Sequence, residues 1–155
     1  LETAGGIAKA LPLLRQLNSH NVFLAVSGDV FTDYDYAQLH GKADELAAQS
    51  VPNMHLVMVE NPDFHAQGDF VLSAGRLYAK TTQLYDPQAR ALTFGNIGLY
   101  DMREFADIRV GEKVAMSPFY KASIEHGHAS GEIFAGLWEN VGTPAQLAQL
   151  NQKQS

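Results

Sequence analysis

One short apolar run limits the possible folds of this chain more than any other feature of its sequence. Met54 to Val59 is apolar at every position except His55. A strand with one solvated face alternates apolar and polar side chains, whereas an unbroken apolar run is typical of a strand covered on both faces. The run therefore predicts a sheet with helices packed on both sides, the layered arrangement of α/β proteins.

Helical and extended segments alternate along the rest of the chain, as such a layered fold requires. Helices are expected near residues 5–17, where Pro12 disturbs the pattern, over 39–47 behind a cap from Asp33 or Asp35, from Ser117-Pro118, and from the capping box Thr143-Pro144-Ala145-Gln146. Strands are expected at 22–26, 54–59 and 92–100, and hairpins at 70–79 and 133–138. We therefore expect one α/β domain over residues 1–150 with a mixed, mostly parallel sheet flanked by helices, followed by a polar tail at 151–155 that frays.

Charge and composition exclude several classes of function. The 155 residues carry a formal net charge of −6, which argues against a nucleic acid partner because phosphate neutralisation needs a basic surface. There is no cysteine, so disulfides and thiolate metal sites are excluded. No apolar run approaches the ~18 residues that span a bilayer, and no charged segment precedes an apolar one as in a signal peptide. A cytoplasmic protein that binds neither membrane nor nucleic acid is expected, with its oligomeric state left open.

A carboxylate stands where open α/β sheets bind their ligands. Val22 to Val26 is an apolar strand, and Gly28-Asp29 follows it. Ligands of such sheets bind beyond the carboxyl ends of the strands. Asp29 is therefore well placed to hold a divalent metal and a nucleotide, with a plain turn aspartate as the alternative. A second polar residue, Asn140, comes just before the helix start Gly142-Thr143-Pro144.

Five segments of the chain stand in a recognisable order. They are residues 1–7 (LETAGGI), 28–35 (GDVFTDYD), 61–65 (NPDFH), 68–70 (GDF) and 138–144 (WENVGTP). Together they resemble the sugar-1-phosphate nucleotidyltransferases, in particular the N-acetylmuramate-1-phosphate uridylyltransferases of bacterial cell-wall recycling, with mannose-1-phosphate guanylyltransferase-like proteins next. The resemblance covers nearly all of residues 1–150 and implies a Rossmann-like, GT-A-like nucleotidyltransferase fold.

The resemblance also implies a reaction and a set of site residues. A sugar 1-phosphate and a nucleoside triphosphate are joined with release of pyrophosphate, with Mg²⁺ as cofactor. Asp29 is implied as the catalytic metal ligand, and Asn140 stands at the position of the second ligand. The resemblance implies that the nucleotide contacts the segment Thr3-Ala4-Gly5-Gly6 and also Gly28. The sugar is expected to contact Asn61, Gly68, Asp69, Asn96, Gly98 and Glu132, although Glu132 can equally be a surface strand residue.

The sequence departs from the family pattern in two places. Members usually carry Asp where this chain has Asn140, and an amide oxygen can coordinate Mg²⁺ without bringing a negative charge. Members also begin with a Gly-rich loop that carries Arg and Lys and wraps the triphosphate. No such loop precedes Leu1, so a fragment that is inactive alone is expected. A different hexose 1-phosphate and a nucleotide-sugar-binding protein without turnover remain as alternatives.

Overall fold

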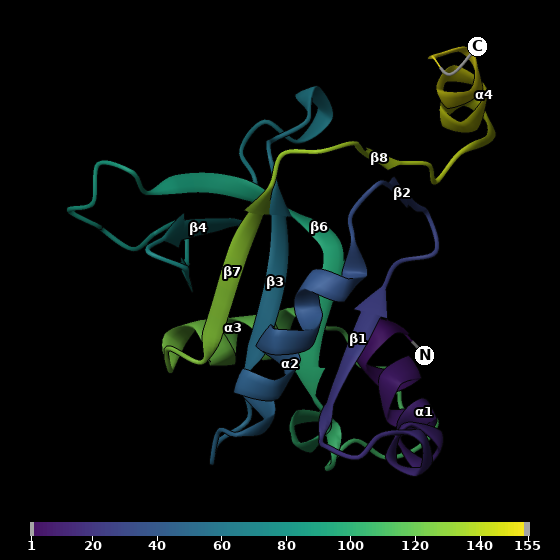
Figure 1. Ribbon diagram of the computed structural model, residues 1–155, viewed down its shortest axis with the longest axis vertical. Coiled ribbons are helices and arrows are strands. Elements are labelled where there is room, and N and C mark those ends of the chain that lie inside the picture. The colour runs from purple at the N-terminus through teal and green to yellow at the C-terminus, as the bar shows by residue number, and fades with distance from the viewer. Residues whose placement is uncertain (1, 154–155) are drawn as a thin grey trace.

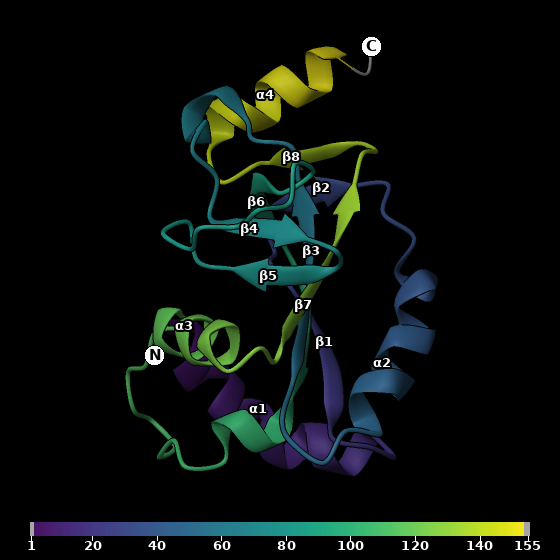
Figure 2. The same ribbon diagram turned by 90° about the vertical axis from the view of Figure 1, so that its left-hand side faces the viewer.

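The computed structural model describes residues 2–153, which form a curved sheet with helices on both sides (Figures 1 and 2). The helices are α1 (Glu2–Leu17), α2 (Leu39–Ala47), α3 (Ser117–Glu125) and α4 (Pro144–Lys153), with short 3₁₀ turns η1 (Tyr36–Gln38), η2 (Asp63–His65) and η3 (Met102–Phe105). The strands are β1 (Val22–Val26), β2 (Val30–Thr32), β3 (Met54–Val59), β4 (Phe70–Ser73), β5 (Arg76–Tyr78), β6 (Arg90–Asp101), β7 (Ala129–Phe134) and β8 (Trp138–Asn140). None of these helices is long and apolar enough to cross a bilayer.

The main sheet is mixed, as expected, but mostly antiparallel. Its strand order is β1-β6-β3-β7-β5-β4, and β2 pairs with β8 in a separate two-stranded sheet. Among the described pairings only β3 with β7 is parallel, because the long strand β6 runs antiparallel to β1, β3 and β4. The expectation of a mostly parallel sheet is therefore wrong. The alternation of helical and extended segments predicts crossover helices between parallel strands. The chain instead enters β6 from the β4–β5 hairpin, without a crossover helix, and this connection cannot be seen in the alternation.

Strand β3 lies at the centre of the sheet, as its apolar run predicts. All six of its residues are buried. Leu56 and Met58 belong to a core cluster beneath α1 and α3, whereas Val57 packs on the opposite face with Leu39 and Leu46 of α2. Figure 2 shows α2 on one side of the sheet and α3 on the other.

Several local predictions are confirmed and others are wrong. Asp35 caps η1 by accepting a 3.0 Å hydrogen bond from the Ala37 N–H, while Asp33 accepts one from the Leu137 N–H at 2.8 Å. Thr143 caps α4, which continues to Lys153 instead of fraying at residue 151. No hairpin forms over 133–138, because β8 leaves the main sheet to pair with β2.

Candidate active site

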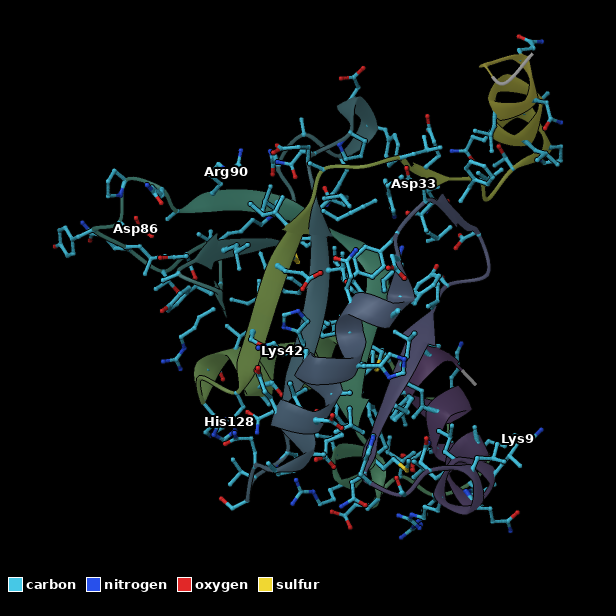
Figure 3. The ribbon with its side chains drawn as sticks, viewed as in Figure 1. Lys9, Asp33, Lys42, Asp86, Arg90 and His128 are labelled. Carbon is cyan, nitrogen blue, oxygen red and sulfur yellow. The ribbon has the colours of Figure 1, made fainter. Side chains whose placement is uncertain are left out.

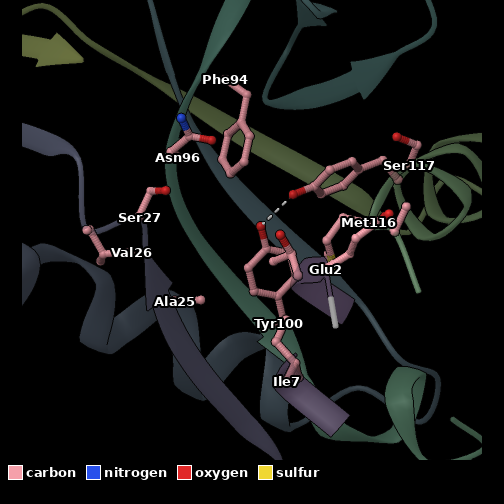
Figure 4. A pocket seen from close by; sticks show the side chains of 14 residues that line it. Glu2, Ile7, Ala25, Val26, Ser27, Phe94, Asn96, Tyr100, Met116 and Ser117 are labelled. Atoms are coloured by element: carbon pink, nitrogen blue, oxygen red, sulfur yellow. Dashed lines mark hydrogen bonds between the residues drawn. The ribbon is translucent and has the colours of Figure 1, made fainter. Parts of the chain in front are cut away.

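Two adjoining cavities open on the face of the sheet that carries α1 and α3. The large cavity, about 660 Å³, lies between α1, β1, β6 and α3 (Figure 4). The aromatic cavity, about 380 Å³, is lined by Phe64, His65, Asp69, Phe70, Thr93, Phe94, Asn96, Ser117, Tyr120, Trp138 and Asn140. Phe94, Asn96, Ser117 and Tyr120 line both cavities, so one extended ligand can occupy the two together.

Asp29 and Asn140 are brought close together by the pairing of β2 with β8. Val30 of β2 is paired with Asn140 of β8, and the Val141 N–H donates to the Asp29 carbonyl at 2.7 Å. Both side chains aim at one place, since a methyl group on Gly142 would lie 3.3 Å from Asn140 Oδ1 and 3.5 Å from Asp29 Oδ2. Gly28 lines the large cavity and Asn140 the aromatic one. The short β2–β8 sheet thus brings together two segments that lie far apart in the sequence.

The chemistry of this pair suits a hard cation. Asp29 Oδ1 is buried and has no hydrogen-bond partner among the described residues. An uncompensated buried carboxylate oxygen destabilises a fold, so its presence fits a site where a cation completes it. Mg²⁺ accepts such a sparse set of one or two protein oxygens when substrate phosphates and waters fill the remaining positions. Residues 2–153 contain no cluster of three or more His, Cys, Asp or Glu side chains that could hold a metal alone.

The floor of the large cavity carries two tyrosines whose hydroxyls lie 3.1 Å apart, Tyr100 and Tyr120. Burial is the main cause that raises the pKa of each phenol. Both therefore remain neutral at physiological pH and supply hydroxyls rather than charge. Figure 4 shows this hydrogen bond beside the Asn96 and Phe94 side chains.

Of the residues expected to contact the nucleotide, Thr3 and Gly28 line the large cavity. Ala4 is fully buried in the core, and a Cβ on Gly5 would lie 2.2 Å from the Glu112 carbonyl oxygen. Gly5 is thus needed for close packing of α1 against the loop before α3. These residues lie in the first turns of α1, which begins at Glu2, ahead of the start expected near residue 5, and neither Ala4, Gly5 nor Gly6 is among the described residues that line the large cavity.

Of the residues expected to contact the sugar, some line the aromatic cavity and others do not. Asp69 and Asn96 line the aromatic cavity, and Asn96 has a left-handed φ of 57°. Asn61 lies behind it, donating to the Ala66 and Ala91 carbonyls and accepting from Thr93. Gly68 and Gly98 are buried and are not among the residues that line this cavity.

Glu132 lies on the other face of the sheet. It is paired with Val57, which packs under α2, and its carboxylate accepts from the Tyr34 hydroxyl at 2.5 Å and lies 3.2 Å from His55 Nε2. Burial lowers the pKa of His55, while Glu132 opposes that shift only in part. Burial, with a smaller effect of Glu132, raises the pKa of Tyr34. Glu132 is thus a partly exposed strand residue that contacts His55 and Tyr34, and it is not among the described residues that line the large and aromatic cavities.

Sequence reasoning missed the aromatic lining and one polar pair. Trp138 Nε1 donates to the Gly95 carbonyl at 2.9 Å, which holds its ring at the cavity wall. His65 Nε2 lies 3.0 Å from Asp69 Oδ1. The spacing of four residues around Gly68 could have suggested this pair, whereas the aromatic residues come from separate segments whose convergence no spacing reveals.

Comparisons with known proteins agree with this fold. No family model matches the chain. The described fold matches HddC from Yersinia pseudotuberculosis complexed with GMP-PN, at a TM-score of 0.67 and 13% identity over 100% of this chain and 63% of that one. It also matches a putative glucose-1-phosphate thymidylyltransferase from Bacillus anthracis, at a TM-score of 0.63 and 18% identity over 99% of this chain and 62% of that one. The fold is therefore that of sugar-phosphate nucleotidyltransferases.

A curated relative makes the resemblance more specific. The chain is 36% identical over 149 residues to the N-acetylmuramate alpha-1-phosphate uridylyltransferase of Neisseria meningitidis serogroup B. The match covers 96% of this chain and 60% of that protein, so the chain spans about three fifths of the relative's length. The resemblance to the sugar-1-phosphate nucleotidyltransferases expected from the five sequence segments is confirmed.

Proposed function

We propose that the protein carrying this chain is a cytoplasmic sugar-1-phosphate nucleotidyltransferase that joins UTP to N-acetylmuramate 1-phosphate in cell-wall recycling. A phosphate oxygen of the sugar 1-phosphate attacks the α-phosphorus of the triphosphate. The bond from that phosphorus to the bridging oxygen breaks, and pyrophosphate leaves. The relative's name supports the substrates. The observation that carries the proposal is the convergence of Asp29 and Asn140 beside Gly142, with Asn140 lining the aromatic cavity and Gly28, next to Asp29, lining the large one.

The attacking phosphate is already an anion near neutral pH, so the reaction needs alignment and charge compensation more than a strong base. In this proposal Asp29 and Asn140 hold Mg²⁺, which would offset the charge of the phosphate oxygens. Thr3 and Gly28 face the nucleotide in the large cavity. Asn96 and the aromatic cavity hold the sugar, and the neutral Tyr100 and Tyr120 offer hydroxyls without adding negative charge.

Measuring pyrophosphate release from the full-length protein tests the proposal. Mg²⁺ is supplied with each nucleoside triphosphate in turn, and with N-acetylmuramate, N-acetylglucosamine, mannose and glucose 1-phosphates. Turnover that is fastest with UTP and N-acetylmuramate 1-phosphate supports it. A preference for another sugar or base makes the protein a nucleotidyltransferase of different specificity. Binding without turnover favours the non-catalytic alternative, which the uncharged Asn140 motivates.

The metal assignment has a test that does not depend on turnover. Because Asp29 Oδ1 is buried without a partner, Asp29→Asn should unfold at the same or a higher temperature than wild type without metal. Adding Mg²⁺ should raise the unfolding temperature of wild type but not of Asp29→Asn. Asn140→Asp should need less Mg²⁺ for the same rise. Equal responses of all three proteins would remove both residues from metal binding.

A further inference from the structure

The pair of His65 and Asp69 is anchored on strand β6 but belongs to the aromatic cavity. Asp69 Oδ2 accepts a 2.8 Å hydrogen bond from the Phe94 N–H, and the Asp69 N–H donates to the Leu92 carbonyl at 2.8 Å. Asp69 Oδ1 lies 3.0 Å from His65 Nε2. Since both carboxylate oxygens of Asp69 already have partners within the protein, Asp69 orients His65 rather than contacting a ligand itself.

His65 is the side chain of this pair that a ligand can reach. It lines the aromatic cavity and its side chain is 38% exposed. With Nε2 directed to Asp69, its second ring nitrogen, Nδ1, is left for a ligand. A neutral ring that donates from Nε2 can only accept at Nδ1, whereas an imidazolium donates from both nitrogens.

His65 is also the side chain that can bring a positive charge to the large and aromatic cavities. Among the described residues that line the large and aromatic cavities, it alone can carry a positive charge. The other titratable residues of the aromatic cavity are Asp69, already paired, and Tyr120, which stays neutral because burial raises its pKa. An anionic substituent on the sugar would therefore find its counter-charge at His65.

We propose that the Asp69-held His65 imidazolium binds a carboxylate carried by the sugar, so that the site selects acidic sugar 1-phosphates over neutral ones. This inference rests on the proposed function. N-acetylmuramate differs from N-acetylglucosamine by a lactyl ether that ends in a carboxylate. Imidazolium and carboxylate form a charge-assisted hydrogen bond, which is stronger than a bond between neutral groups.

A second group of cations lies nearby and provides the control. An adjacent cavity of about 480 Å³, which shares Asp69 and Tyr120 with the aromatic cavity, is lined by Lys80 and Lys121. Lys80 donates to the Gly68 carbonyl at 2.8 Å, and Lys121 is 77% exposed beside a glutamate. Lys121→Gln therefore removes a nearby positive charge without altering the pair.

The test compares kcat/KM of the full-length protein for N-acetylmuramate 1-phosphate with that for N-acetylglucosamine 1-phosphate, with UTP and Mg²⁺ fixed. Wild type should prefer the acidic sugar. His65→Gln keeps an amide that can donate to Asp69 and should lower this preference by roughly 10- to 100-fold, the loss of one charge-assisted hydrogen bond. Asp69→Asn should lower it in the same direction, and Lys121→Gln should keep it.

Equal losses for both sugars in His65→Gln, or a preference lost in Lys121→Gln and kept in His65→Gln, would overturn the assignment. So would a wild type that does not distinguish the two sugars. If neither sugar is turned over, the proposed function fails separately. Calorimetric titration of both sugar phosphates onto wild type and His65→Gln then decides the point. Weaker binding of the acid alone supports His65, and equal affinities of the two proteins overturn it.

Discussion

Replacing Gly68 with alanine should destabilise the chain far more than its single methyl group suggests. Gly68 has a left-handed φ of 60°, and a Cβ there would lie 2.7 Å from Asn61 Oδ1 and 2.7 Å from the carbonyl carbon and oxygen of Leu92. The left-handed backbone costs an alanine about 1–2 kcal/mol. Forcing the β6 backbone aside adds roughly 1–3 kcal/mol, offset by about 0.4–1 kcal/mol from the stiffer unfolded chain.

The net loss for Gly68→Ala is therefore about 2–4 kcal/mol, or a fall in Tm of roughly 5–15 °C for a domain of this size. Gly75→Ala is the matched control, because Gly75 also has a positive φ, of 76°, but nothing lies within 4 Å of its Cβ position. It should lose only about 1 kcal/mol. Urea unfolding followed by circular dichroism measures both. Losses of equal size would refute the role of the close approach to β6.

Three further substitutions test local features of the fold. Ala74 has a φ of 47° ahead of Gly75 in the β4–β5 turn, so Ala74→Asn should raise the free energy of unfolding by about 0.5–1 kcal/mol in urea titrations. Burial is the largest cause that raises the pKa of Glu104, so the folded state binds its proton more tightly and stability falls as pH rises through this raised pKa. Glu104→Gln, which can still accept from Ser123, should be more stable than wild type at pH 7 and lose that advantage below about pH 4 in thermal melts. Trp138→Phe removes the donor to the Gly95 carbonyl and should cost about 1–3 kcal/mol in urea titrations, whereas an unchanged midpoint would show that this bond is dispensable.

The parts of the fold that the sequence predicts are those set by local periodicity. The buried strand at residues 54–59, the helix over 39–47 and the hairpin at 70–79 all need only their own side-chain pattern. Strand direction and partner are set by contacts far along the chain, so the pattern misses the antiparallel course of β6 and the departure of β8. Local spacing likewise does not reveal that Gly5 packs against the Glu112 carbonyl, where a Cβ would lie only 2.2 Å from the oxygen.

The candidate site shows the same division. Asp29 and Asn140 are each marked by their own neighbours in the sequence, one after a strand and one before a helix start. The roles of Asp69 and Glu132 could not be separated in this way, because the side of the sheet that each faces depends on its partner strand. Asp69 follows a turn beside β6, whereas Glu132 is aligned with Val57 and points toward α2.

The pairing of β2 with β8 shows how so short a sheet can hold a precise pair of oxygens. Side chains alternate between faces along a strand, so a slip of one residue would turn Asn140 away from the Asp29 side. Three aligned positions alone hold this register weakly. Side-chain and main-chain bonds flank the ladder at both ends, from the Leu137 N–H to Asp33 at 2.8 Å and from the Val141 N–H to the Asp29 carbonyl at 2.7 Å. Asp33 can be expected to cap a helix or to act as a further acidic ligand, but in the structure it tethers the start of β8 through the Leu137 N–H and so supports the register that positions Asn140.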